Sequence, residues 1–175
     1  ETKEAFINVQ AVPNADFTAS PRSGNTPLTV QFEDTSVTAP FEATAWRWTF
    51  GDGEVSTERN PAHTYIQPGE YNVSLTVTSD GGTNTVTRNR YITAAQLPQV
   101  QFEATPVTGA APLDVRFTDM TIAGSAPINS WTWVFGDGGT SNEQNPTYRF
   151  ETPGVYSISL TTRTAAGEIT GTMNN

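Results

Sequence analysis

The sequence of 175 residues contains no cysteine, a single lysine, a single histidine and no apolar run long enough to cross a bilayer. Without cysteine the chain forms no disulfide and carries no thiol chemistry. Its formal net charge of −9 repels both a phosphate backbone and an anionic membrane surface. We therefore expect no nucleic-acid partner and no membrane insertion.

The chain does contain an internal repeat. Setting each residue against the one 85 positions later aligns residues 17–90 with residues 102–175 without a gap and gives 29 identities in 74 pairs. The shared residues are mostly turn formers and aromatic residues, such as Phe32 with Phe117. Residues of these types indicate a shared fold rather than a shared active site.

The repeat predicts the domain organisation. We assign residues 14–94 to a first domain and residues 100–175 to a second domain whose last strand is incomplete, with residues 95–99 as the linker. Residues 1–13 then form the tail of a preceding repeat or a linker. The chain is long enough for two compact domains to fold without disulfides.

The clearest motif in each copy is a strand followed by a tight turn. Three aromatic residues alternate with other residues and precede Gly-Asp-Gly, so their rings leave one face of a strand before the chain turns. We predict structural roles in the core and the turn for twelve residues: Trp46, Trp48, Phe50, Gly51, Asp52 and Gly53, and Trp131, Trp133, Phe135, Gly136, Asp137 and Gly138.

This motif resembles the polycystic kidney disease (PKD) repeat, whose signature is aromatic-x-Trp-Asp-Phe-Gly-Asp-Gly, with Thr49 and Val134 here at the place of the first Asp. The match continues through residues 60–65 and residues 68–71. The resemblance implies an all-β fold of two tandem immunoglobulin-like β-sandwich domains with no significant helix. It also implies an extracellular or cell-surface location.

Other stretches fit this fold. Leu28, Val30 and Phe32 alternate with polar residues, which indicates a half-buried strand. Residues 37–44 and 122–129 show no alternation, and we predict that they form variable loops before the Trp-containing strands.

Catalytic groups are scarce. His63 is matched by Tyr148 in the second copy, so a role common to both copies cannot depend on an imidazole. Asp52 and Asp137 are each flanked by glycines, and a carboxylate in such a turn typically accepts backbone N–H groups. We expect the chain not to be an enzyme, although its parent protein can carry a catalytic domain elsewhere.

Calcium is an alternative that the resemblance raises, because some PKD repeats bind it through acidic residues in the loop before the Trp-containing strand. In this sequence Glu42 is the only acid in the first loop, and the second loop has none. Asp34 and Asp119 are weak candidates for metal ligands. We expect no cofactor and no bound metal.

Two functions fit these observations. The first is a non-catalytic tandem PKD module that acts as spacer and interaction accessory of a larger secreted or surface protein. The alternative is a module that binds polysaccharide or fibres through exposed aromatic residues, for which Trp46, Phe41 and Trp131 are the candidates. The expected partners are neighbouring domains of the same chain and, for the alternative, a polysaccharide or an extracellular protein. We expect a monomer.

The first residues continue the repeat. The same offset sets Phe6 and Ile7 against Tyr91 and Ile92. One hypothesis is that these residues of one molecule take the place of the missing strand end in the second copy of another. The other is that residues 1–12 run along the first copy.

Overall fold

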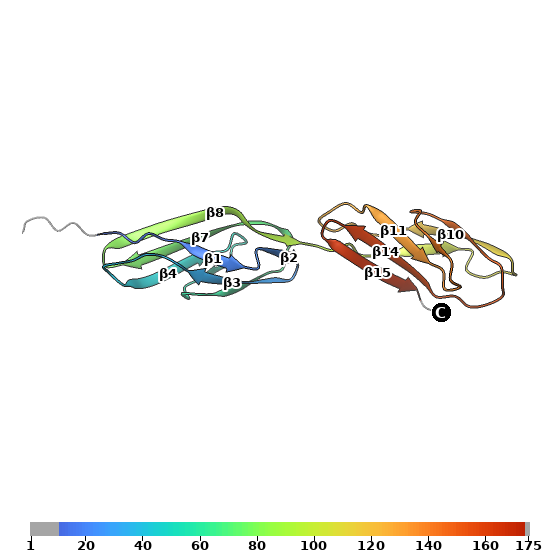
Figure 1. Cartoon of the computed structure of the whole chain (residues 1–175), viewed down its shortest axis with the longest axis horizontal. Helices are drawn as coiled ribbons and strands as arrows, with labels where there is room; N and C mark the ends of the chain where they lie inside the picture. Colours follow the sequence, from blue (N-terminus) through green and yellow to red (C-terminus); the bar gives the residue numbers. More distant parts are fainter. Residues whose placement is uncertain (1–10, 174–175) are drawn as a thin grey trace, which may run out of the picture. The chain divides into compact units, whose positions relative to one another are not determined.

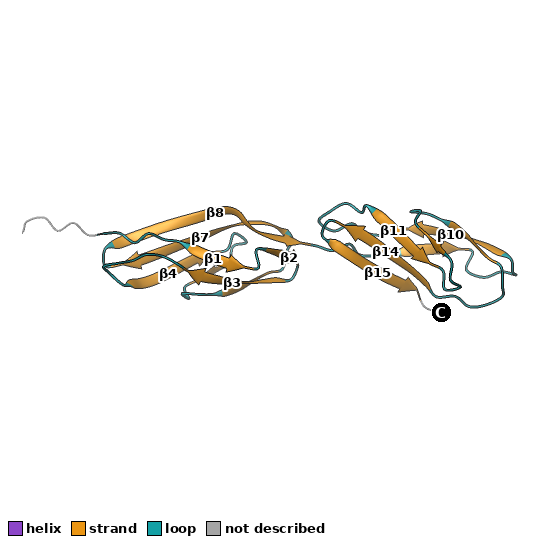
Figure 2. Ribbon diagram, viewed as in Figure 1, coloured by secondary structure: helices purple, strands orange, loops and turns teal. Residues whose placement is uncertain are grey.

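The computed structural model of the chain describes residues 11–173 (Figure 1). The chain divides into two compact units between Ala94 and Ala95, here called unit 1 and unit 2. All regular elements of the described residues are strands, which confirms the predicted all-β class without significant helix (Figure 2). No helix that could span a membrane occurs in that part of the chain. The predictions for residues 1–10 lie outside the described residues.

Unit 1 consists of two antiparallel sheets. The three-stranded sheet has the order β1-β3-β6, and the five-stranded sheet has the order β2-β8-β7-β4-β5. The strand bounds are β1 Phe17–Ser20, β2 Ser23–Asn25, β3 Leu28–Asp34, β4 Ala43–Thr49, β5 Val55–Ser56, β6 Ala62–Tyr65, β7 Gly69–Ser79 and β8 Gly82–Ala95.

Unit 2 repeats this arrangement with fewer strands. Its sheets have the orders β13-β10-β9 and β12-β11-β14-β15. The strand bounds are β9 Phe102–Thr105, β10 Leu113–Asp119, β11 Ser130–Val134, β12 Thr140–Ser141, β13 Thr147–Phe150, β14 Ile158–Thr164 and β15 Gly167–Met173.

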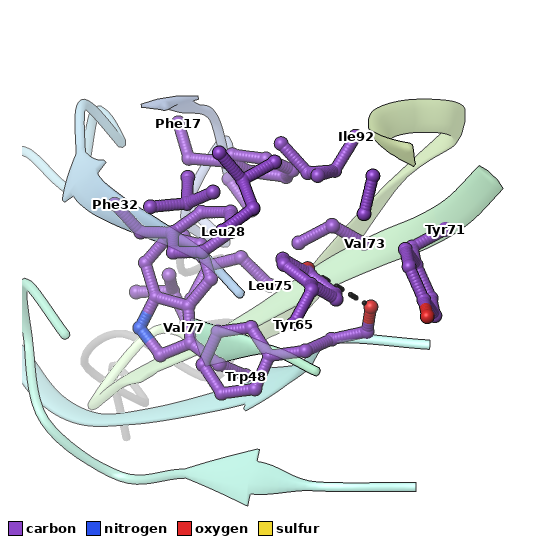
Figure 3. Close-up of a cluster of buried hydrophobic side chains, with 14 residues drawn as sticks. Phe17, Leu28, Phe32, Trp48, Tyr65, Tyr71, Val73, Leu75, Val77 and Ile92 are labelled. Atoms are coloured by element: carbon purple, nitrogen blue, oxygen red, sulfur yellow. Dashed lines mark hydrogen bonds between the residues drawn. The ribbon is translucent and has the colours of Figure 1, made fainter. Parts of the chain in front are cut away.

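The core of unit 1 lies between its two sheets and is built by alternation along the strands. In β3 every second residue is buried, as the pattern Leu28, Val30, Phe32 predicts. Trp48 of β4 is fully buried and meets Phe17 and Phe32 of the other sheet at ring-centroid distances of 5.2 and 5.5 Å (Figure 3). Burial of several aromatic rings supplies much of the driving force for folding.

The loops before the Trp-containing strands differ slightly from the prediction. In unit 1 the strand already begins at Ala43, within the range 37–44 that we predicted as loop, and a β-bulge lies between Ala43 and Ala45. Alternation is broken there because a bulge inserts an extra residue, so the sequence pattern does not show the strand. In unit 2 the strand begins at Ser130, directly after the predicted loop.

Residues predicted as linker are hydrogen-bonded within unit 2. Gln96 exchanges hydrogen bonds with Ser125, and Gln99 forms an antiparallel bridge with Ile122. The loop before β11 therefore holds the segment that leads into β9.

The two copies diverge at one strand. β7 begins at Gly69, whereas β14 begins only at Ile158, the counterpart of Val73. The first residues of β7 pair with the end of β8, through Gly69 with Ala94 and Tyr71 with Ile92. In unit 2 the corresponding residues 154–157 belong to no strand.

Candidate functional site

Trp48 and Trp133, at the centre of the predicted motif, are fully buried in their units. Each indole N–H donates to a backbone carbonyl, that of Glu58 or of Glu143, at 2.9 Å. A buried indole N–H without an acceptor would cost free energy, so this contact is needed for Trp at these positions. Both residues are core elements with no surface left for a ligand.

The Gly-Asp-Gly turns are closed by their own aspartates. Asp52 accepts the backbone N–H of Glu54 at 3.1 Å, and Asp137 accepts that of Gly139 at 2.9 Å. The glycines on both sides of each aspartate have positive φ, between 79 and 102°. Glycine adopts this conformation without the steric cost that a side chain brings.

His63 and Tyr148 perform one task with two different rings. His63 stacks on Phe50 at a centroid distance of 4.1 Å, with its Nε2 2.7 Å from the carboxylate of Asp52. Tyr148 stacks on Phe135 at 3.9 Å and donates its hydroxyl to Asp137 at 3.0 Å. Burial and the hydrogen bond with Asp137 raise the pKa of Tyr148. The shared requirement is a flat ring with a hydrogen-bonding edge, which supports a structural role.

Trp46 and Trp131 are half-buried and linked to the opposite sheet. The Trp46 indole donates to Asp34 at 2.9 Å, and the Trp131 indole donates to Asp119 at 2.7 Å. The guanidinium of Arg59 lies over the Trp46 ring, 5.6 Å from its centroid. Both indoles pack against the cores, so neither stands out as a flat platform for a sugar.

Phe41, the third candidate for ligand binding, is half-buried in the loop before β4. It lies close to the β7–β8 turn, where a Cβ added to Gly81 would come within 3.0 Å of its ring. The large hydrophobic side chains exposed in the described residues are aliphatic or Met, with no aromatic residue among them. The structure therefore does not gather Trp46, Phe41 or Trp131 into an exposed aromatic surface.

The two metal candidates use their carboxylates within the fold. Asp34 is buried, and besides Trp46 it accepts the backbone N–H of Ser36 at 3.0 Å and the side chain of Arg59 at 3.3 Å. Asp119 accepts the side chain of Gln144 at 3.1 Å in addition to Trp131. Within residues 11–173 no group of three or more His, Asp or Glu side chains could hold a metal ion.

Unit 2 also has a groove with a volume of about 790 Å³, in the copy whose last strand was expected to be incomplete. Its apolar lining includes Leu113 and Tyr156, together with Val107, Val155 and Met173, which are 76%, 77% and 45% exposed. The sequence carried a signal for it. Position by position, these last three residues are matched by Arg22, Glu70 and Arg88 in the first copy.

Comparisons with known proteins place these features in context. The chain is 40% identical over 84 residues to a microbial collagenase of Vibrio alginolyticus, which is 47% of this chain and 10% of that protein. It is 41% identical over 66 residues to collagenase ColA of Clostridium perfringens, which is 37% of this chain and 6% of that protein. The chain thus spans a tenth or less of the length of these relatives.

Among solved structures, the PKD1 domain of the Vibrio cholerae metalloprotease PrtV is 31% identical, with a TM-score of 0.41, and the match covers 47% of this chain and 99% of that one. The family model described as PKD domain matches twice, over residues 10–94 and residues 96–175. Both copies of the Trp-containing strand and its Gly-Asp-Gly turn fall within these matches. The chain belongs to the PKD domain family and consists of two such domains in tandem.

Proposed function

We propose that this chain is a non-catalytic, extracellular module that acts as spacer and interaction accessory within a larger protein. The observation that carries the proposal is that the four aspartates shared by the two copies are engaged within the fold. Asp34 and Asp119 accept hydrogen bonds from the indole N–H groups of the half-buried tryptophans. Asp52 and Asp137 accept backbone N–H groups within the Gly-Asp-Gly turns. The same contacts in both copies maintain a structural framework, and within residues 11–173 these side chains do not form a convergent acid, base and nucleophile.

The similarity to domains of collagenases and a metalloprotease supports the accessory part of the proposal. Collagen is an insoluble substrate found outside cells, and a module beside a catalytic domain can hold or orient such a substrate. The chain spans only a small part of those proteins, so the activity and substrate of its own parent protein belong to this proposal.

The test is a pair of fusions of one secreted metalloprotease catalytic domain, with and without residues 1–175. We expect the module to change the rate of cleavage of insoluble collagen and to leave the rate on a short soluble peptide unchanged. The chain alone should hydrolyse neither. Equal rates for the two fusions on the insoluble substrate would refute an accessory role on collagen.

Polysaccharide binding through exposed aromatic residues ranks second. Trp46 and Trp131 are half-buried with their N–H groups bonded, which speaks against stacking on sugars. Sedimentation of the chain with cellulose and chitin, beside insoluble collagen, tests the alternative. Binding to a polysaccharide that is lost in Trp46→Phe and Trp131→Phe variants would reverse the order of the two proposals.

A further inference from the structure

The ladder between β7 and β8 of unit 1 is interrupted by a β-bulge. Its register shifts between Tyr71 and Val73, so Asn72 of β7 stands opposite residues 89–91 of β8. In the middle of these residues Arg90 has a φ of 49°, and it is the one non-glycine residue with positive φ within residues 11–173. Bulges re-aim the side chains beside them. The side chain re-aimed here is that of Asn72.

One hydrogen bond fixes the orientation of the Asn72 amide. Its Oδ1 accepts the backbone N–H of Arg90 at 2.8 Å. A backbone N–H can only donate, so the amide oxygen must be the atom that faces β8. The amide nitrogen Nδ2 then lies on the side away from Arg90, and Asn72 is exposed. The nitrogen of this side chain is therefore open to a reagent from solvent.

The residues around Asn72 form a modification motif. The stretch reads Glu70-Tyr71-Asn72-Val73-Ser74, and Asn-x-Ser/Thr with x other than proline is the acceptor motif for N-linked glycans. It occurs once in the 175 residues. Bacterial oligosaccharyltransferases also read an acidic residue two positions before the asparagine, and here that residue is Glu70.

The three motif residues that an enzyme reads lie on one face of β7. Glu70, Asn72 and Ser74 alternate with Tyr71 and Val73, which are buried in the core cluster of unit 1 (Figure 3). Alternate side chains of a strand leave opposite faces of the sheet, so the acid, the amide and the hydroxyl share the outer face. The Glu70 side chain is 53% exposed. An enzyme that approaches from solvent meets all three groups together.

The second copy lacks the motif. Its counterpart stretch reads Val155-Tyr156-Ser157-Ile158-Ser159, so a valine replaces the acid and a serine replaces the asparagine, while the last hydroxyl is retained. The site is specific to unit 1, and the chain contains its own matched control.

We propose that Asn72 is an N-glycosylation site that accepts an oligosaccharide from a polyprenyl-diphosphate donor. In the transfer, a bond forms between Nδ2 of Asn72 and C1 of the first sugar, while the bond between C1 and the diphosphate oxygen of the donor breaks. The amide nitrogen loses one proton, and the polyprenyl diphosphate leaves. This inference rests on the extracellular location in the proposed function, because such transfer takes place on exported chains.

The test is export of the full chain, with an added signal peptide, in a bacterial host that carries an oligosaccharyltransferase and its lipid-linked oligosaccharide. Intact-mass spectrometry should show a fraction of the chain that is heavier by one glycan, and fragmentation should place the glycan on Asn72. The same host without the transferase should give the unmodified mass. Unmodified exported chain in the presence of the transferase, or a glycan on another residue, would overturn the proposal. The signal peptide supplies export, so this failure is distinct from failure of the accessory role on collagen.

Three variants test how the site is read. Asn72→Gln should remove the glycan. Ser74→Ala should remove it too, although this variant keeps the contact between Asn72 and Arg90. Glu70→Gln should lower the modified fraction strongly, since it removes the acid and keeps the shape of the side chain. Full modification of the Ser74→Ala protein would show that the motif is not what the enzyme reads.

Transplanting the motif provides the gain-of-function control. Val155→Glu/Ser157→Asn gives unit 2 the sequence Glu-Tyr-Asn-Ile-Ser at two exposed positions. We expect this protein to carry a second glycan, and the same two substitutions combined with Asn72→Gln should leave one glycan, in unit 2. A glycan in unit 2 together with an unmodified Asn72 would show that the bulge hides the acceptor, and would overturn the proposal.

Discussion

At the scale of single residues, the four tryptophans divide into two pairs with different partners. Trp48 and Trp133 donate to backbone carbonyls inside their own units and lie at the centre of the aromatic clusters. Trp46 and its counterpart donate to carboxylates on the opposite sheet. The first pair fills the core. The second pair lies at the edge of the core and links the two sheets of each unit through hydrogen bonds.

Truncation of Trp48 to Ala should lower the free energy of unfolding of unit 1 by about 3 to 5 kcal/mol, because it removes a fully buried ring and leaves a cavity. Hydrogen exchange followed by mass spectrometry resolves the two units in the full chain. Protection should fall in residues 11–94 and persist in unit 2, and Trp133→Ala should show the reverse. Unaltered protection in Trp48→Ala would place the core elsewhere.

Tyr65 should make unit 1 sensitive to alkaline pH. Its hydroxyl donates to the carbonyl of Phe50 at 3.1 Å in the buried core, and burial, with a smaller effect of the Asp52 charge, raises its pKa far above the usual 10.0. A raised folded-state pKa means that the contribution to stability is complete below pH 10 and is lost as the pH rises toward the folded-state value. Phe150 is the counterpart of Tyr65 in unit 2.

We therefore expect the denaturant concentration at the midpoint of unit 1 unfolding to fall between pH 9 and 11. In this pH range the Tyr65 hydroxyl ionises in the unfolded chain but stays protonated in the folded one. The Tyr65→Phe variant should show a smaller shift over the same range. The reverse change, Phe150→Tyr, should make unit 2 more sensitive. Parallel pH profiles of wild type and Tyr65→Phe would contradict this assignment.

At the scale of elements, each Gly-Asp-Gly turn combines two glycines with different constraints. Both Gly51 and Gly53 have positive φ, at 91 and 102°. A Cβ on Gly51 would lie 2.5 Å from the carbonyl oxygen of Asn72, whereas a Cβ on Gly53 would meet nothing within 4 Å. The first glycine is needed for packing against β7 as well as for its conformation.

This difference predicts the outcome of two matched substitutions. Gly53→Ala should cost about 1 to 2 kcal/mol, which is the strain of a positive φ alone. Gly51→Ala should cost clearly more, because the backbone of β7 must move as well. Denaturant unfolding of the two variants measures the difference. Equal losses of stability would mean that the contact with Asn72 relaxes freely.

At the scale of the whole molecule, each unit is held by its own core and its own set of internal hydrogen bonds. The carboxylates of the two candidate metal ligands are engaged by N–H donors, that of Asp34 by Trp46, Ser36 and Arg59 and that of Asp119 by Trp131 and Gln144. We infer that neither unit requires calcium for its stability.

Calcium added in excess over chelator should accordingly leave the melting temperature of the full chain unchanged within error. A cation bound to the folded state would raise it, by mass action. Calorimetry with and without chelator makes the comparison, with Asp34→Asn and Asp119→Asn as variants. A calcium-dependent rise in melting temperature that these substitutions abolish would show that bound calcium stabilises the folded chain.

The sequence alone predicted the all-β class, the repeat and the residues that face the core, because period-two alternation and Gly-containing turns encode local geometry directly. Trp48 and Leu28 were placed in this way. The bulge at Ala43 was missed, since a bulge interrupts the very alternation from which strands are recognised.

Only the tertiary structure decided which groups meet across the sheets. Asp34 was a weak metal candidate until its position opposite Trp46 appeared, twelve residues away and on the other sheet. The groove of unit 2 likewise depends on which strand ends lie side by side. Such pairings arise between segments far apart in the chain, so no local pattern around Asp34 reveals its partner until the fold brings the two side chains together.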